Sequence, residues 1–300
     1  MLCEFSNISD SLLLSFIAIW VILTIIATLM VFLTSGPTFY FYYWKSNVTF
    51  EKWRYKSNPQ FPPPEKVRDE IIQMMKGVTC ASICPAFSFA LAQNGYSKAY
   101  CGWNGYTLGY HVFQFFLIML VNDFWEFFYH RLGHTDFRFW RHHKHHHKFF
   151  NPSPFAVIAD EWIDQFFRSA LLLIFPLVMP INMDLMFFEF GLFFYAYGVY
   201  LHWGYELECI STHNPVMNTS FQHYLHHAKS LMNKPYHCGF FFKIWDQLFS
   251  CVYPKEKCFC AECARNKGER TKEEFQQVVL QDYSKLFSSS LWMNYFQRVK

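Results

Sequence analysis

The sequence predicts an all-α membrane protein: a polytopic bundle of about four membrane helices, including a helical hairpin, with a cytosolic histidine-rich metal-binding cap. Two observations support this fold class. Hydrophobic residues make up 52% of the chain and charged residues only 16%, a balance too apolar for an ordinary soluble enzyme. Thirteen of the 14 histidines lie between residues 130 and 237. The net charge of +3 is small and the basic residues are dispersed, which argues against a nucleic-acid partner.

The first membrane span is predicted over residues 12–33. This stretch is almost wholly apolar and long enough to cross a bilayer. Basic residues follow it, so the positive-inside rule places the next loop in the cytosol and the N-terminus in the lumen. These basic residues are Lys45, Lys52, Arg54 and Lys56.

Two further uncharged stretches, residues 77–97 and 99–122, predict the second and third spans. The third span should continue as a helix into the first histidine pair. The apolar stretches 169–183 and 190–205 are each marginal in length, and Pro176, Pro180 and Asp184 interrupt them. We therefore expect a helical hairpin that returns to the side it entered. This topology places every histidine cluster on one cytosolic face.

The histidine spacing predicts a centre for two metal ions. Spacings of three and four residues place imidazoles on one face of a helix, and neutral imidazole is a good ligand for transition metals. The clusters hold more imidazoles than one tetrahedral ion could use. Ordinary polar or core histidines are the alternative, which accounts for His111 but poorly for three repeated clusters. The candidate ligands are His130, His134, His143, His146, His147, His202, His223, His226 and His227.

Three acidic residues are candidates for supporting the ligands. Asp123 and Glu126 precede His130 on the predicted helix and could accept hydrogen bonds from ligand imidazoles. The alternative is that they cap the helix interior or pair with Arg131 or Arg138. Asp164, after the second cluster, is the third candidate.

These motifs resemble the membrane fatty acid hydroxylase and sterol desaturase superfamily. The matching elements occur in the family's order: an acidic residue and aromatics before His130-Arg-Leu-Gly-His134, then His143-Lys-His-His146-His147, His202-Trp-Gly-Tyr205, His223-Tyr-Leu-His226-His227 and Ile244-Trp-Asp-Gln-Leu248. The chain looks closest to the sterol C5-desaturase (lathosterol oxidase) branch. It departs from that branch at Tyr224, where Thr is usual, and at Glu161-Trp162, where His-Pro is usual.

The resemblance implies a non-haem di-iron oxidoreductase that uses O2 to oxidise a sterol in the endoplasmic-reticulum membrane. A fatty acid, sphingolipid or sterol hydroxylase on the same scaffold is the alternative. Electrons would come from cytochrome b5 and its NAD(P)H-dependent reductase, which fits the absence of a Gly-rich dinucleotide motif. A zinc transporter or metal-buffering membrane protein is more remote, because it should carry ionisable residues inside its spans. The expected divisions are membrane spans and loop (1–106), catalytic domain (107–253) and cytosolic tail (254–300).

Further metal-binding candidates lie outside the three histidine clusters. His213, His237 and Glu206 are further candidate ligands of the iron centre, although Glu206 also reads as an exposed acid at a helix end. Cys258, Cys260 and Cys263 predict a structural zinc site in the tail, with reduced, unligated thiols as the alternative.

Overall fold

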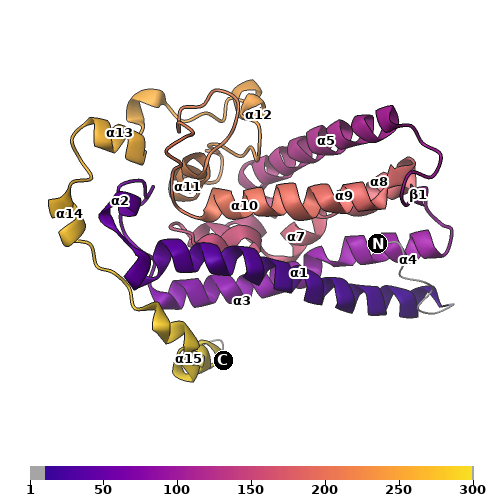
Figure 1. The fold of residues 1–300 in the computed structure, drawn as a ribbon, viewed down its shortest axis with the longest axis horizontal. Coiled ribbons are helices and arrows are strands. Elements are labelled where there is room, and N and C mark those ends of the chain that lie inside the picture. Colours follow the sequence, from indigo (N-terminus) through magenta and orange to yellow (C-terminus); the bar gives the residue numbers. More distant parts are fainter. Residues whose placement is uncertain (1–10, 299–300) are drawn as a thin grey trace.

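The computed structural model describes residues 11–298 and is a bundle of long helices (Figure 1). Four helical segments are long and apolar enough to cross a membrane, and they run side by side along the long axis of the molecule. These segments are Leu12–Tyr43, Pro64–Gln93, Leu108–Thr135 and Met183–His202. The predicted fold class, an all-α membrane bundle with histidine clusters, is confirmed.

The first span, helix α1 (Leu12–Tyr43), is longer than predicted. It continues past residue 33 because the chain remains uncharged to Trp44, and Pro37 does not end it. Leu13, Val21 and Leu33 are exposed along its length. Such an apolar outer face suits contact with lipid.

The second span begins earlier than predicted and consists of α3 (Pro64–Ala81) and α4 (Ile83–Gln93). Pro64 occupies the first turn of α3, where its missing N–H costs nothing. Residues 64–76 were missed as part of the span because they carry charges. Helix α3 ends at Ala81, the residue whose carbonyl the ring of Pro85 would meet in a continuous helix.

The third span, α5 (Leu108–Thr135), starts later than predicted and then continues unbroken into the histidine region, as expected. Thr107 caps it by accepting a hydrogen bond from the Tyr110 N–H (3.3 Å). The preceding residues form strand β1 (Ala99–Tyr100) and turns in which Gly102 and Gly105 have positive φ. Those glycines are the reason that the helix cannot begin at residue 99.

The hairpin enters the bundle through α7 (Trp162–Arg168) and α8 (Leu171–Val178). Its tip is strand β2 (Ile181–Asn182), which pairs in parallel with β1 in the loop between the second and third spans. The chain returns through α9 (Met183–Phe188), a π-helical segment η5 (Glu189–Phe194) and α10 (Tyr195–His202). Pro176, Pro180 and Asp184, the predicted breaks, lie in α8, directly before β2 and in the first turn of α9, and the return arm is helical over its whole length.

The remaining elements form a cap at the opposite end of the bundle from β1 (Figure 1). Its α-helices are α2 (Phe50–Trp53), α6 (Phe137–His143), α11 (Ser220–Lys229), α12 (Ile244–Leu248), α13 (Ala261–Asn266), α14 (Lys272–Gln276) and α15 (Ser289–Arg298). Its short 3-10 turns are η2 (Lys45–Asn47), η3 (His146–Lys148), η4 (Pro154–Ile158), η6 (Lys255–Lys257) and η7 (Tyr283–Phe287).

The basic first loop belongs to this cap. The Ser57 N–H donates to the Gly204 carbonyl (3.0 Å), and the Glu206 N–H donates to the Tyr55 carbonyl (2.8 Å). The loop is therefore held against the chain that leaves His202. The expected lumenal N-terminus falls on residues 1–10, outside the described residues.

The tail also packs against the cap rather than extending away from it. The Tyr283 hydroxyl donates to the Pro62 carbonyl (2.7 Å), and Arg68 donates to the Leu291 carbonyl (2.7 Å). The predicted short helices are present as α13, α14 and α15.

Candidate metal centre

The nine candidate histidines converge into two adjacent groups. The first group comprises His130, His134, His143, His147 and His226; the second comprises His146, His202, His223 and His227. Within each group, one ring nitrogen of every member lies within 4.8 Å of those of all the others. The groups also touch each other, since the ring centroids of His147 and His227 are 5.2 Å apart.

Helix periodicity explains how two of the clusters supply these groups. His130 and His134 lie one turn apart on α5 and face the same group. On α11, His223 and His227 are also one turn apart and belong to the second group, while His226 is turned toward the first. One short helix therefore serves both groups.

The middle cluster does not form a single helical face. Helix α6 ends at His143, and a separate 3-10 turn begins at His146. As a result His143 and His147 join the first group, whereas His146 joins the second. The prediction that these three share one helical face is wrong, although all three lie among the nine.

Backbone carbonyls fix the orientation of five imidazoles. In each of them Nδ1–H donates to a carbonyl, which leaves Nε2 with a free lone pair. The acceptors are Cys238 for His130 (3.0 Å), Leu231 for His134 (3.2 Å), Ala159 for His146 (3.3 Å), Gly198 for His202 (2.7 Å) and Tyr236 for His226 (2.6 Å).

The free nitrogens are spaced as metal ligands would be. The Nε2 atoms of His134 and His226 are 3.1 Å apart, and those of His202 and His223 are 2.8 Å apart. With metal–nitrogen bonds of about 2.1 Å, neighbouring ligands of one ion lie roughly 3.0–3.4 Å apart. The buried His130 Nε2 has no hydrogen-bond partner in the protein. The donor set therefore fits metal ions.

Burial keeps these imidazoles in the neutral, ligating form. It is the largest cause that lowers the pKa of each imidazole outside the membrane spans, and neighbouring imidazoles add to the effect for most of them. The imidazoles concerned are His143, His146, His147, His223, His226 and His227.

Asp123 supports the centre through a loop rather than through an imidazole. Its carboxylate accepts hydrogen bonds from the Phe241 N–H (2.6 Å) and from the Trp245 indole N–H (2.8 Å). The same loop contains Cys238, whose carbonyl holds His130. Asp123 therefore positions that loop.

Glu126 and Asp164, the other acidic candidates, also contact groups other than imidazoles. Glu126 pairs with Arg168 (2.5 Å), a partner that neither interpretation of this residue named. Arg168 also contacts Asp160 (3.2 Å). Asp164 accepts a hydrogen bond from the Tyr129 hydroxyl (2.9 Å) and lies near His143 and Asp160.

Two carboxylates near the centre were missed, one beside an imidazole and one holding the loop of Cys238. Asp160 Oδ1 lies 3.3 Å from His146 Nδ1, close to the Ala159 carbonyl that accepts the Nδ1 proton. Asp246 accepts the N–H groups of Cys238 (2.7 Å) and Gly239 (3.1 Å). The Trp-Asp motif after the last histidine cluster could have identified Asp246. No motif or spacing in the sequence marks Asp160.

The three less certain ligands lie outside both groups. His213 lies beside the tail cysteines, with its Nε2 3.2 Å from Cys263 Sγ. His237 accepts a hydrogen bond from the Tyr253 N–H (3.2 Å). Glu206 is buried, not exposed, and accepts the N–H groups of Ala261 (2.6 Å) and Glu262 (3.0 Å).

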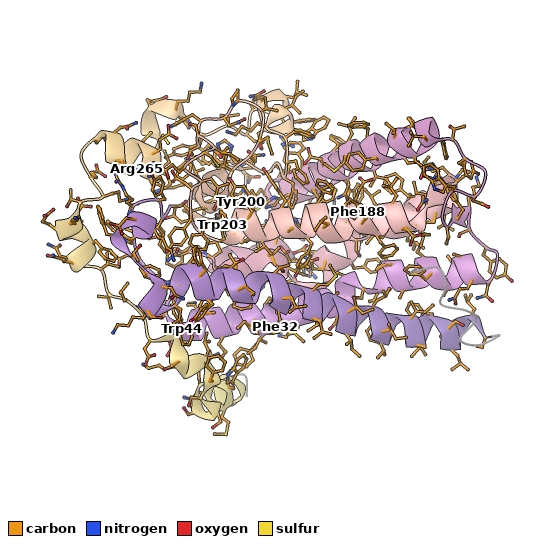
Figure 2. The ribbon with its side chains drawn as sticks, in the orientation of Figure 1. Phe32, Trp44, Phe188, Tyr200, Trp203 and Arg265 are labelled. Atoms are coloured by element: carbon orange, nitrogen blue, oxygen red, sulfur yellow. The ribbon has the colours of Figure 1, made fainter. Side chains whose placement is uncertain are left out.

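An apolar cavity of about 490 Å³ lies within the bundle, lined by residues of its long helices. Phe188 lines this cavity, and Figure 2 shows the residue midway along the bundle, with Tyr200 and Trp203 nearer the cap. Glu126 and Gly198 also line it, each one helical turn before a histidine: His130 and His202 respectively. The volume falls in the range of small-molecule sites.

Comparison with known proteins agrees with this architecture. Residues 115–251 match the fatty acid hydroxylase family. The Delta(7)-sterol 5(6)-desaturase of Gibberella zeae is 31% identical over 271 residues, which cover 90% of this chain and 72% of the relative. The chain belongs to the fatty acid hydroxylase family.

Further relatives place this hydroxylase-family chain in the sterol C5-desaturase branch. The Delta(7)-sterol 5(6)-desaturase of Saccharomyces cerevisiae is 27% identical over 243 residues, covering 80% of this chain and 61% of the relative. The lathosterol oxidase of Mus musculus is 26% identical over 246 residues, covering 80% and 76%. No solved structure matches the chain significantly.

Proposed function

We propose that this chain is a membrane oxidoreductase that uses O2 to oxidise a sterol, introducing a double bond as its relatives' names describe. The observation that carries the proposal is the division of nine imidazoles into two adjacent groups, in a bundle whose apolar cavity is lined by Glu126 and Gly198, one helical turn before His130 and His202. The sterol desaturase relatives favour a sterol over a fatty acid as the substrate.

We propose one iron ion in each histidine group. Imidazole suits iron, and two neighbouring ions account for nine ligands better than one. When bound, the irons would supply the redox chemistry that activates O2 and removes hydrogen from an unactivated C–H bond. The His-ligated groups lack thiols and so differ from a zinc site of the kind suggested for the tail cysteines.

The protein's own residues would position the ligands and exclude water. Carbonyls on the loops around α11 hold Nδ1 of His134 and His226, so that their Nε2 atoms face inward. The Ala159 carbonyl plays the same role for His146. The apolar walls of the cavity, which include Phe194 and Phe240, would bind the sterol rings and keep bulk water from the centre.

The membrane orientation is part of the proposal. We infer that the cap faces the cytosol of the endoplasmic reticulum, where cytochrome b5 and its reductase could deliver electrons. The basic first loop lies in the cap, in line with the positive-inside rule. Cys101, at the opposite end, is disulfide-bonded, whereas Cys238, Cys251 and Cys260 in the cap are free. Disulfides form in oxidising compartments, which supports a lumenal position for Cys101.

Sterol profiling in yeast tests the proposal. The chain is expressed in a Saccharomyces cerevisiae strain that lacks its own Delta(7)-sterol 5(6)-desaturase, and sterols are measured by mass spectrometry. We expect a 5(6)-unsaturated sterol with the wild-type chain and none with His226→Ala. His142→Ala is the matched control, because His142 belongs to the same histidine-rich region but to neither group, and it should retain activity.

Two results would count against the proposal. A product that gains one oxygen atom without a double bond would indicate a hydroxylase instead. Full activity of His226→Ala would contradict the assignment of the histidine groups.

A further inference from the structure

The chain carries a second set of metal-ligand side chains, separate from the nine histidines. His213 lies in the connection between α10 and α11, and three cysteines lie in the tail around the start of α13. The ligand atoms of His213, Cys258, Cys260 and Cys263 all lie within 4.8 Å of one another. Sequence spacing grouped only the cysteines; the histidine comes from 45 or more residues upstream.

The geometry of this set matches one tetrahedral ion. His213 Nε2 lies 3.2 Å from Cys263 Sγ and 3.7 Å from Cys260 Sγ. With zinc–sulfur bonds of about 2.3 Å and zinc–nitrogen bonds of about 2.1 Å, a tetrahedral site has sulfur–nitrogen edges of roughly 3.6 Å. The two nitrogen–sulfur distances bracket that value, so the side chains need only small shifts to close around an ion.

The chemistry of the donors distinguishes this set from the iron centre. Three sulfurs and one imidazole are a common donor set of structural zinc sites, whereas sites built only from imidazoles suit iron. The Cys260 Sγ also accepts a hydrogen bond from the Cys263 N–H (3.2 Å), a contact that favours a thiolate. We propose that His213, Cys258, Cys260 and Cys263 bind one structural zinc ion.

The zinc would fasten the tail to the connection between two ligands of the second histidine group. That connection runs from His202 to His223. Hydrogen bonds already join it to α13: Glu206 accepts the Ala261 N–H (2.6 Å), and Glu262 accepts the Thr212 N–H (3.1 Å). The ion adds a crosslink beside these bonds.

The same tail segment also contacts the first loop. Arg265 on α13 stacks on the Tyr55 ring at 4.0 Å and donates to the Arg54 carbonyl (3.0 Å). Figure 2 shows Arg265 in the cap, far from Phe188 in the bundle. Zinc would therefore join the connection between α10 and α11 to the tail, and Arg265 links that tail segment to the first loop.

The site is open to an incoming ion. His213 is exposed, and Cys258 and Cys263 are half-buried, while Cys260 lies inside. A metal can therefore enter after the chain has folded, and a chelator can reach it. All four residues lie on the side that we assign to the reducing cytosol, where thiols stay available as ligands.

Metal analysis of the purified full-length protein tests the proposal. Zinc and iron are measured separately by mass spectrometry on protein expressed with both metals. We expect about one zinc per chain in the wild type and a loss of most of it in Cys263→Ser and His213→Asn, with the iron content unchanged. Because His213 is exposed, His213→Asn should fold even if Cys263→Ser does not.

Cys209→Ser is the matched control. Cys209 lies in the same connection as His213 and is exposed, but it is outside the four-residue set. It should keep its zinc. The proposal would be overturned if the wild-type protein contained no zinc, or if both ligand variants retained their zinc. A loss of zinc from Cys209→Ser as large as that from the ligand variants would also overturn it.

Cobalt substitution gives a readout that does not depend on enzyme activity. Wild-type protein loaded with Co²⁺ should show a thiolate-to-cobalt charge-transfer band in the near ultraviolet, and Cys263→Ser should lose most of it. An identical band in the two proteins would refute the site. If a ligand variant loses zinc but keeps its iron and its sterol oxidation, the proposed function still holds. The zinc site and the proposed function can therefore be refuted independently of each other.

Discussion

Gly133→Ala should displace one metal ligand while leaving the chemistry of all nine unchanged. Gly133 lies on α5 between His130 and His134, and the ring of His143 packs directly against it. A Cβ atom at this position would lie 2.8 Å from His143 Cγ and 2.9 Å from its Cδ2. Carbon atoms normally approach to about 3.5–4.0 Å, so the imidazole must retreat by roughly 0.7 Å or more.

The expected loss is larger for metal binding than for folding. Overpacking of this kind costs about 1–3 kcal/mol, and replacing a helical glycine by alanine returns about 0.5–1 kcal/mol. The net change in unfolding free energy is thus modest. A misplacement approaching 1 Å at a reacting centre can lower activity by about 100-fold. We expect sterol product to fall at least tenfold, with a lower iron content.

Gly109→Ala is the control for this prediction. It lies on the same helix, and its added Cβ would have its nearest contact at 3.8 Å, with Thr107 Oγ1. It should leave iron and activity intact. The reasoning would be refuted if Gly133→Ala, purified and assayed in parallel, held as much iron and formed as much product as Gly109→Ala.

Three other predictions address the supports of the centre, the cavity and the imidazoles. Asp246→Ala should lower the free energy of unfolding by about 1–3 kcal/mol and weaken iron binding, because the N–H groups of Cys238 and Gly239 lose their acceptor. A denaturant unfolding curve identical to that of the wild type would contradict this. Gly191→Phe should fill the cavity beside Met30 and reduce sterol turnover while iron stays bound, whereas Gly36→Phe, with open space around it, should do neither. In the folded, metal-free protein, burial lowers the pKa of these imidazoles, and unfolding returns it to about 6.5. Below that pH the unfolded state binds more protons than the folded state, so the free energy of unfolding falls as pH falls. The thermal midpoint in chelator should therefore drop between pH 7.5 and 5.5, and a constant midpoint would argue against buried neutral imidazoles.

The sequence was most informative where local periodicity decides the structure. Helical spacing predicts correctly that His130 and His134 face one way on α5, and that α11 presents several imidazoles. Hydropathy locates the spans, but not their ends. The cap formed by Thr107 sets the start of α5, and the ring of Pro85 sets the end of α3. A hydropathy profile detects neither effect.

Tertiary contacts decided what the sequence could not. The division of the imidazoles depends on the turn between His143 and His146, which has no helical period. The partner of Glu126 is Arg168, 42 residues away, and His213 meets Cys263 across 50 residues. Pairings over such separations arise only once the bundle has brought the segments together.

The iron stoichiometry of the purified protein tests the central claim most directly. We expect about two iron ions per chain in the wild type, and about one in His134→Ala and in His202→Ala, because each variant removes a ligand from a different group. His142→Ala should keep both. Wild-type protein that binds a single iron when iron is in excess, or variants that each keep two, would contradict the two-group centre.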